Sequence, residues 1–215
     1  ANSDIEYVWV KVGDDALLLA KELVESSMEA AKVTEYEVLP GIMKGKDIEG
    51  LRFVHPMYED RKVPVILGDH VTLEAGTGLV HTAPDHGVED FEVCKKYPDW
   101  HLEPIGTVGP DGKYTSAVPG YEGKFALDMN VEMIKALAAS GALFAKGSLR
   151  HQYAHCWRCK NPIIYRATEQ WFSSVDGYRK KALEAIDQVQ WIPSWGHDRI
   201  YNMIRDLSLI HISEP

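Results

Sequence analysis

The segment of residues 76–91, GTGLVHTAPDHGVEDF, constrains the fold more than any other part of the chain. Its glycines let the backbone bend and approach a ligand closely. An apolar pair predicts a strand that ends near His81, because Pro84 cannot continue a ladder. Asp85 is suited to cap a helix that would carry Asp90 in its first turn. The pattern predicts a strand, a tight corner and a helix start, with an imidazole and a carboxylate side by side.

Turn residues divide the first half of the chain into short segments. β-Branched and aromatic residues predict a strand over residues 5–12. After a Gly-Asp-Asp turn, apolar residues at helical spacing predict an amphipathic helix over residues 16–28. Frequent Gly and Pro then favour short strands at residues 36–39, 51–55, 63–67 and 71–73. Many short strands separated by turns are typical of a β-barrel-like body.

Helices and a cysteine pair characterise the second half. Apolar spacing and turn residues predict helices over residues 130–140, 177–189 and 193–205. Cys156 and Cys159 form a Cys-x-x-Cys sequence, which short strands at residues 148–153 and 163–166 should flank as in a metal knuckle.

These elements predict an α+β chain with four segments. We expect a β-barrel-like domain with peripheral helices at residues 1–148, followed by a small Cys-x-x-Cys knuckle with connecting strands at residues 149–176. A helical return segment should occupy residues 177–206. Residues 207–215 are expected to form an atypical tail.

The charge, hydropathy and cysteine content limit which partners the chain can bind alone and the compartment in which it occurs. Its 215 residues carry a net charge of −9, whereas gripping a nucleic acid alone would need a basic excess. No apolar run approaches the roughly 18 residues of a membrane span. Three cysteines without a secretory signal indicate a reducing, cytoplasmic setting. Cys94 lacks a neighbouring base, so we expect a buried apolar residue rather than a nucleophile.

Three sequence blocks resemble segments of isoleucyl-tRNA synthetases and occur in the same order as in that family. Residues 76–91 resemble their editing-site signature, G-T-G-x-V-H-x-A-P-x-H-G-x-x-D-[FY]. His81 and Gly87 follow the isoleucyl version, since the related valyl enzymes carry Lys and Asp there. Residues 155–172 (HCWRCKNP, then YRATEQWF) and residues 191–200 (WIP, WG and RI) supply the other two blocks.

The resemblance implies the editing insert of such an enzyme. The insert hydrolyses the ester of valyl-tRNA(Ile), because a synthetic site separates side chains that differ by one methylene only by about 1–3 kcal/mol. The implied partners are the acceptor end of tRNA(Ile) carrying valine and the rest of a monomeric synthetase, which joins isoleucine to tRNA with ATP. Editing needs no cofactor. The alternatives are a fragment that binds aminoacyl-adenosine without catalysis, the valyl equivalent, and an unrelated zinc-knuckle module.

The family pattern assigns catalytic roles to His81 and Asp90. Asp90 would bind the α-ammonium group of the substrate, and His81 the terminal ribose hydroxyl or the ester. Position alone also allows a solvated carboxylate in a first helical turn and a buried structural histidine. His86 is expected to support the site without touching the substrate. The implied substrate-binding residues are Asn2, Gly76, Thr77, Gly78, His81, Ala83 and Asp90.

The two ends of the chain carry further expectations. Ala1-Asn2 resembles the end of a threonine-rich pocket loop, T-T-P-W-T-L-P-A-N, whose threonines the chain lacks. The chain therefore looks cut from a larger protein, and it should fold but edit poorly on its own. Residues 207–215 leave the family pattern and resemble a translated sequencing adapter, so we expect a foreign tail without function. Cys156 and Cys159 are half of a zinc site, whose other Cys-x-x-Cys lies upstream in zinc-binding relatives. Zinc is expected in the full-length enzyme rather than in this chain.

Overall fold

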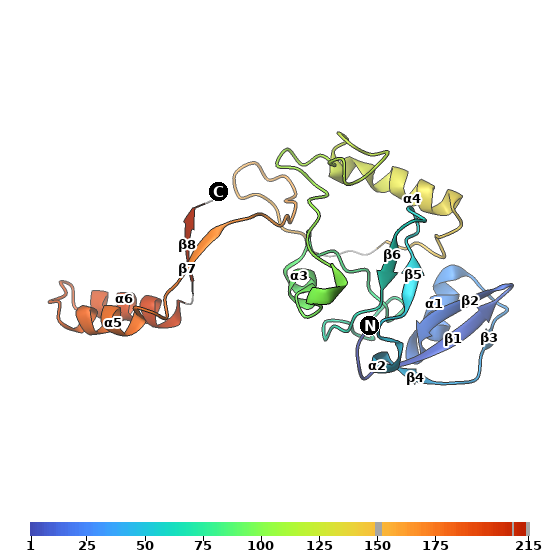
Figure 1. Ribbon diagram of the computed structural model, residues 1–215, viewed down its shortest axis with the longest axis horizontal. Coiled ribbons are helices and arrows are strands. Elements are labelled where there is room, and N and C mark those ends of the chain that lie inside the picture. Colours follow the sequence, from blue (N-terminus) through green and yellow to red (C-terminus); the bar gives the residue numbers. More distant parts are fainter. Residues whose placement is uncertain (149–151, 208, 214–215) are drawn as a thin grey trace. The chain divides into compact units, whose positions relative to one another are not determined.

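The computed structural model describes residues 1–148, 152–207 and 209–213 (Figure 1). The chain divides into two compact units, residues 1–167 and residues 168–215. No helix in the described parts of the chain combines the length and the apolar character that crossing a membrane requires.

A four-stranded antiparallel sheet organises the first unit. Strand β1 (Glu6–Val12) pairs along its length with β2 (Asp15–Ala20). Two short strands, β3 (Glu37–Val38) and β4 (Met43–Lys44), pair with successive parts of β1. Gly13, with φ +60°, makes the tight turn that fixes the β1–β2 register.

The predicted helix over residues 16–28 is wrong in its first half. Residues 15–20 form β2, and the helical part begins with η1 (Lys21–Leu23) and α1 (Val24–Ala31). A short continuous apolar run has no period that separates a strand from a helix. The Gly13 turn decides the outcome, because it returns the run alongside β1.

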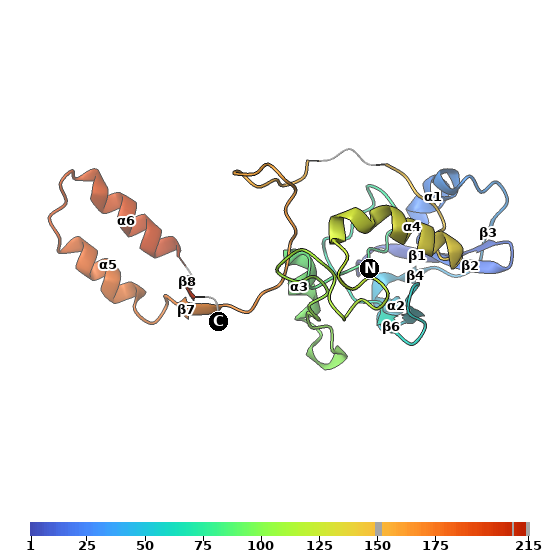
Figure 2. The ribbon, with the colours of Figure 1, turned by 90° about the horizontal axis from the view of Figure 1, so that it is seen from above.

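Alternating side chains of β1 supply two apolar clusters. Val8 and Val10 pack with Val24 and Met28 of α1, which both views place beside the β1–β2 hairpin (Figures 1 and 2). Tyr7, on the other face, packs in a cluster with the buried residues Ala1, Leu18, Ala20, Leu23, Ile48 and Val65. Leu79 of the glycine-rich segment packs against this second cluster. The sheet is therefore covered on both faces, and one cover is the predicted site segment.

The remaining elements of the first unit are short. They are α2 (Gly45–Ile48), the antiparallel hairpin of β5 (Arg52–Val54) and β6 (Lys62–Pro64), α3 (Val88–Cys94), η2 (Pro98–Trp100), η3 (Ala126–Met129) and α4 (Asn130–Ala139). Val93 and Cys94 of α3 pack with Ile66, which ties the helix to the segment after β6. The helix predicted at residues 130–140 is confirmed by α4.

Mixed α and β structure is confirmed, but the barrel-like arrangement is wrong. The described strands form small antiparallel sheets, and none of these sheets closes. The strand predicted at residues 71–73 is absent, and so is the one expected at Leu79-Val80. Backbone groups there bond to other segments instead: the Thr77 carbonyl, for example, accepts from the Ala20 N–H at 2.8 Å.

The second unit contains β7 (Trp171–Ser174), α5 (Arg179–Asp187), α6 (Trp195–Asp206) and β8 (Leu209–Ser213). The helices predicted at residues 177–189 and 193–205 are confirmed. β8 pairs antiparallel with β7, so the segment expected to be an inert tail has a strand partner. Its foreign origin stays a prediction, and residues 208, 214 and 215 lie outside the described residues.

His197 of α6 bonds to two carboxylates, Asp187 of α5 and its own neighbour Asp198, and the bond to Asp187 joins the two helices. Its Nε2 lies 2.9 Å from Asp187 Oδ1, and its Nδ1 lies 2.9 Å from Asp198 Oδ1. The hydrogen bond to Asp198, followed by that to Asp187, raises the pKa of His197 above its usual 6.5. The imidazolium form therefore favours the paired helices.

We expect the stabilisation by His197 to be lost at high pH. A raised folded-state pKa gives stability that is complete below the unfolded pKa of about 6.5 and disappears as the pH rises through the folded value. An NMR titration of the chain should give His197 a pKa above 6.5. His197→Gln should remove this part of the pH dependence of the thermal midpoint. A pKa at or below 6.5 would contradict the assignment.

Candidate functional site

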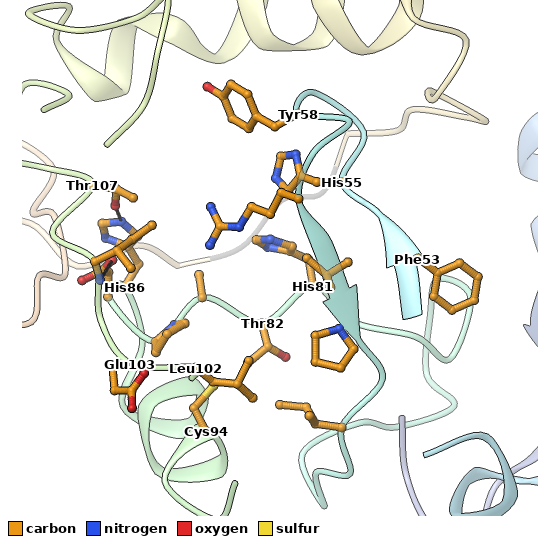
Figure 3. A pocket seen from close by; sticks show the side chains of 18 of the residues that line it. Phe53, His55, Tyr58, His81, Thr82, His86, Cys94, Leu102, Glu103 and Thr107 are labelled. Atoms are coloured by element: carbon orange, nitrogen blue, oxygen red, sulfur yellow. Dashed lines mark hydrogen bonds between the residues drawn. The ribbon is translucent and has the colours of Figure 1, made fainter. Parts of the chain in front are cut away.

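A pocket of about 540 Å³ opens in the first unit (Figure 3). The β5–β6 hairpin, residues 79–86 and residues 101–107 supply most of its lining. In Figure 3 the labelled His55 and His81 lie on one side of the opening, and His86 and Thr107 lie across from them. Apolar groups, including Ile66, Leu79, Cys94 and Leu102, line the same pocket. A cavity that combines an apolar surface with a few polar groups is the usual form of a small-ligand site.

Gly76, Thr77 and Gly78 lie against the sheet and are not part of the pocket lining. The Gly78 carbonyl accepts a 2.7 Å hydrogen bond from the Tyr7 hydroxyl, and the Gly76 carbonyl accepts one of 3.0 Å from Ser27 Oγ. The Thr77 carbonyl bonds to Ala20, and a Cβ at Gly78 would overlap the Cβ of Ala20. These contacts fix the segment in place. Substrate contact by Gly76, Thr77 and Gly78 stays a prediction.

We expect Gly78→Ala to destabilise the chain more than Gly76→Ala. Both glycines have positive φ, +74° and +80°, so alanine costs about 1–2 kcal/mol at either position. At Gly78 the new methyl group also meets Ala20, which adds about 1–3 kcal/mol, whereas Gly76 has open space. Urea denaturation of the two variants measures the difference. Equal losses would show that close packing on Ala20 is unimportant.

His81 and Ala83 line the pocket, and the substrate contact predicted for both stays a prediction. The His81 side chain is exposed, so the alternative of a buried structural histidine is wrong. Asn2 lies outside the lining: its Nδ2 donates to the Val71 carbonyl at 3.0 Å, and its backbone N–H donates to the Tyr7 hydroxyl at 3.1 Å. The structure therefore brings His81 and Ala83 together and leaves Asn2 in a supporting position.

Asp90 lies in the first turn of α3, directly behind the pocket loop. Its Oδ2 accepts a 3.1 Å hydrogen bond from the Ala83 N–H. The Asp90 side chain is half-buried and is not part of the pocket lining. It is close enough to Cys94, which does line the pocket, for its charge to act on that thiol. Asp90 therefore shapes the loop that carries His81 and Ala83.

Asp85 does not cap α3, contrary to the sequence prediction. The buried carboxylate accepts from the N–H groups of Ile105 at 3.1 Å and Gly106 at 3.2 Å. The N-cap position belongs to Gly87, in extended backbone. A distant loop thus competes successfully with the local helix end for the Asp85 oxygens.

His86 connects three segments and also lines the pocket, and its supporting role without substrate contact stays a prediction. Its Nδ1 lies 2.8 Å from the Tyr165 carbonyl, which only accepts, so Nδ1 carries the proton. Its Nε2 lies 2.6 Å from Thr107 Oγ1. The Ala167 N–H adds a 2.8 Å bond to the Asp85 carbonyl. These bonds attach residues 165–167 to the loop beside the pocket.

His55 and Arg61 also line the pocket, and neither is among the site residues expected from the sequence. His55 follows β5, precedes Pro56, and stacks on Tyr58 with ring centroids 5.1 Å apart. A histidine at the end of a strand next to a proline was the available signal. Nothing local, however, shows that this hairpin faces His81.

Comparison with known proteins identifies the family of this chain. A model of the class I tRNA synthetases for isoleucine, leucine, methionine and valine matches residues 3–214. The chain belongs to the class I tRNA synthetases. An isoleucine–tRNA ligase of Caldicellulosiruptor bescii is 51% identical over 205 residues, which cover 95% of this chain and 22% of the relative. Those of Moorella thermoacetica and Histophilus somni are 49% and 48% identical, with 22% and 21% of their lengths covered. The chain therefore spans about a fifth of these synthetases.

The cysteine pair of this synthetase chain forms a small turn rather than a strand-flanked knuckle. Cys156 N–H donates to the Asn161 carbonyl at 2.8 Å, and His155 and Pro162 form an isolated bridge. The strand predicted at residues 163–166 is absent. Of the strand predicted at residues 148–153, residues 149–151 lie outside the described residues. Hydrogen bonds from the N–H groups of Cys159 and Arg158 lower the pKa of Cys156. Thiolate character suits zinc, but no described group of three His, Cys, Asp or Glu side chains could hold a metal.

We expect this chain to bind zinc weakly. Two thiolates leave two of the four tetrahedral positions to water. A mild chelator should remove the metal, and the double substitution Cys156→Ser, Cys159→Ser should abolish what binding there is, while Cys94→Ala leaves it unchanged. Stoichiometric zinc that survives the chelator would contradict the half-site interpretation.

Proposed function

We propose that this chain is the editing part of an isoleucine–tRNA ligase and that its pocket hydrolyses the ester of valyl-tRNA(Ile) in the cytoplasm. The observation that carries the proposal is that His81 and Ala83 line a pocket whose loop is held by Asp90. The similarity to isoleucine–tRNA ligases supports the identity of the substrate. The parent enzyme would join isoleucine to the same tRNA with ATP, as a monomer.

The pocket offers surfaces of two kinds to an aminoacyl ester. Ile66, Leu79 and Leu102 provide apolar contacts suited to the valine side chain. His81 can exchange hydrogen bonds with the ribose hydroxyl or the ester carbonyl. Orientation of the ester by such contacts supplies much of the rate enhancement, since small misplacements cost about a hundredfold.

Asp90 can bind the α-ammonium group of the substrate while it supports the loop that carries Ala83. Oδ2 is engaged by the Ala83 N–H, and Oδ1 has no hydrogen-bond partner in the parts of the chain that the structure describes. A carboxylate accepts several hydrogen bonds, so one oxygen can hold the loop and the other the substrate. The proximity of Asp90 to Cys94 brings its charge to the pocket wall.

The chemistry that fits is attack by water without an enzyme nucleophile. Cys94 lines the pocket, but burial, followed by the charge of Asp90, raises the pKa of its thiol and keeps it protonated. Water adds to the ester carbonyl, the bond from the acyl carbon to the ribose oxygen breaks, and that oxygen takes a proton. The products are valine and tRNA with a free hydroxyl.

In this proposal, other parts of the longer enzyme supply the remaining zinc ligands and the pocket threonines. Cys156 and Cys159 would hold the ion with two ligands from outside the chain. Threonines of a preceding loop would complete the pocket near Ala1, which already contributes to its lining. Hydrolysis by the present chain should therefore fall far below that of the full-length enzyme.

Substitutions at Asp90 test the proposal in the full-length enzyme. Asp90→Asn keeps an oxygen for the Ala83 N–H but removes the charge, whereas Asp90→Ala removes both. We expect each to lower hydrolysis of valyl-tRNA(Ile) by about a hundredfold or more and to leave isoleucine activation within about twofold. Glu89→Gln, at the exposed residue that precedes Asp90 in the same helical turn, is the matched control and should edit normally.

The pattern of losses separates the roles. Near-normal hydrolysis by Asp90→Asn with loss in Asp90→Ala would reduce Asp90 to loop support. Normal hydrolysis by both would remove the carboxylate from the site. Binding of valyl-tRNA(Ile) by the wild-type enzyme without any hydrolysis traceable to this segment would favour the non-catalytic alternative.

A further inference from the structure

We propose that His55 and Arg61, together with His81, form an anion-binding wall that receives the phosphodiester preceding the terminal nucleoside of the acceptor end. This inference rests on the proposed function, because that function brings a terminal nucleoside to the pocket. It assigns a ligand to the β5–β6 hairpin, which the editing motif does not include. All three side chains line the same pocket.

The hairpin turn places His55 and Arg61 next to each other. Their backbones pair through the His55 N–H and the Arg61 carbonyl at 2.7 Å, and the Arg61 N–H donates to the Tyr58 carbonyl at 3.0 Å. The Tyr58 ring stacks on His55, and its hydroxyl donates to the Pro119 carbonyl at 3.1 Å. The turn is therefore braced against a distant loop, and both side chains face the pocket.

The hydrogen bonds of His55 define the proton it offers. The Met57 N–H donates to His55 Nδ1 at 3.1 Å, so Nδ1 is unprotonated and the ring proton is on Nε2. Nε2 has no partner in the described parts of the chain. Burial, then the charges of Arg61 and His81, lower the pKa of His55 and favour this neutral form. His55 thus presents an N–H donor without adding a full charge to that of Arg61.

Arg61 supplies the charge of the wall. No carboxylate among the described residues lies within ion-pair distance of its guanidinium. The acidic groups of the lining are Asp85, whose oxygens are engaged by Ile105 and Gly106, and Glu103. A planar guanidinium with a free donor edge matches the oxygens of a phosphate.

A phosphodiester suits this wall better than the ester does. The ester is neutral, and the α-ammonium group would be repelled by Arg61 and attracted to Asp90. In a chain of net charge −9, a local cationic wall is needed where a polyanion enters. The wall therefore orients the acceptor end, with phosphate on the hairpin side and ammonium on the α3 side.

Nucleoside binding with and without a phosphate tests the wall. NMR titrations of the 215-residue chain would compare adenosine with adenosine 5′-methylphosphate, which carries one negative charge like a phosphodiester. We expect wild-type protein to prefer the phosphorylated probe by about tenfold, the scale of one charge-assisted contact. Arg61→Gln should reduce the preference to within about twofold. Lys62→Gln removes the same charge from the adjacent residue, which does not line the pocket, and should keep the preference.

The outcomes separate this inference from the editing proposal. Equal binding of the two probes, no binding of either at millimolar concentration, or a preference that survives Arg61→Gln overturns the wall. Loss of the preference in Arg61→Gln and its retention in Lys62→Gln support it. Hydrolysis of valyl-tRNA(Ile) by the full-length enzyme is measured independently, so a wall that fails leaves editing standing, and failed editing leaves the phosphate preference measurable.

Discussion

The buried hydroxyl of Tyr7 is the contact on which the site segment depends. It donates to the Gly78 carbonyl at 2.7 Å and accepts from the Asn2 N–H at 3.1 Å. Tyr7 has no exposed surface, so loss of the hydroxyl would leave the buried Gly78 carbonyl and the partly buried Asn2 N–H without this partner. Such groups cost about 1–3 kcal/mol each. Close packing of Gly78 on Ala20 allows this geometry, because a larger residue would hold the segment away from the sheet.

The loop beyond Gly78 is held by side-chain hydrogen bonds to several other segments. Asp90 bonds to Ala83 from α3, and the Asp85 carboxylate reaches forward to Ile105 and Gly106. His86 adds bonds to Thr107 and Tyr165. Irregular backbone needs such partners, since it has no ladder of its own. The result leaves the exposed His81 side chain on the pocket side of a firmly attached loop.

Local patterns allowed part of this arrangement to be predicted. Strand β1 and helices α4, α5 and α6 follow from periodicity and turn residues, and the membership of His81 in a pocket follows from the motif. The failures share one cause. Residues 15–20 became a strand because of the Gly13 turn and pairing with β1, and Asp85 left the helix end for a loop twenty residues away. Partners distant in the sequence decided both, and no local pattern contains them.

The distribution of charge around the pocket also depends on segments that are distant in the sequence. Asp90 comes from the motif, but Arg61 and His55 come from a hairpin whose sequence shows only a turn between two short strands. The fold places these groups on separate elements: the cationic Arg61 and the neutral donor His55 line the pocket, and the Asp90 carboxylate lies behind its loop. A ligand that carries both an ammonium group and a phosphate can satisfy both only in one orientation. Opposite charges on two separately anchored elements therefore select one orientation of such a ligand, whereas either charge alone would not.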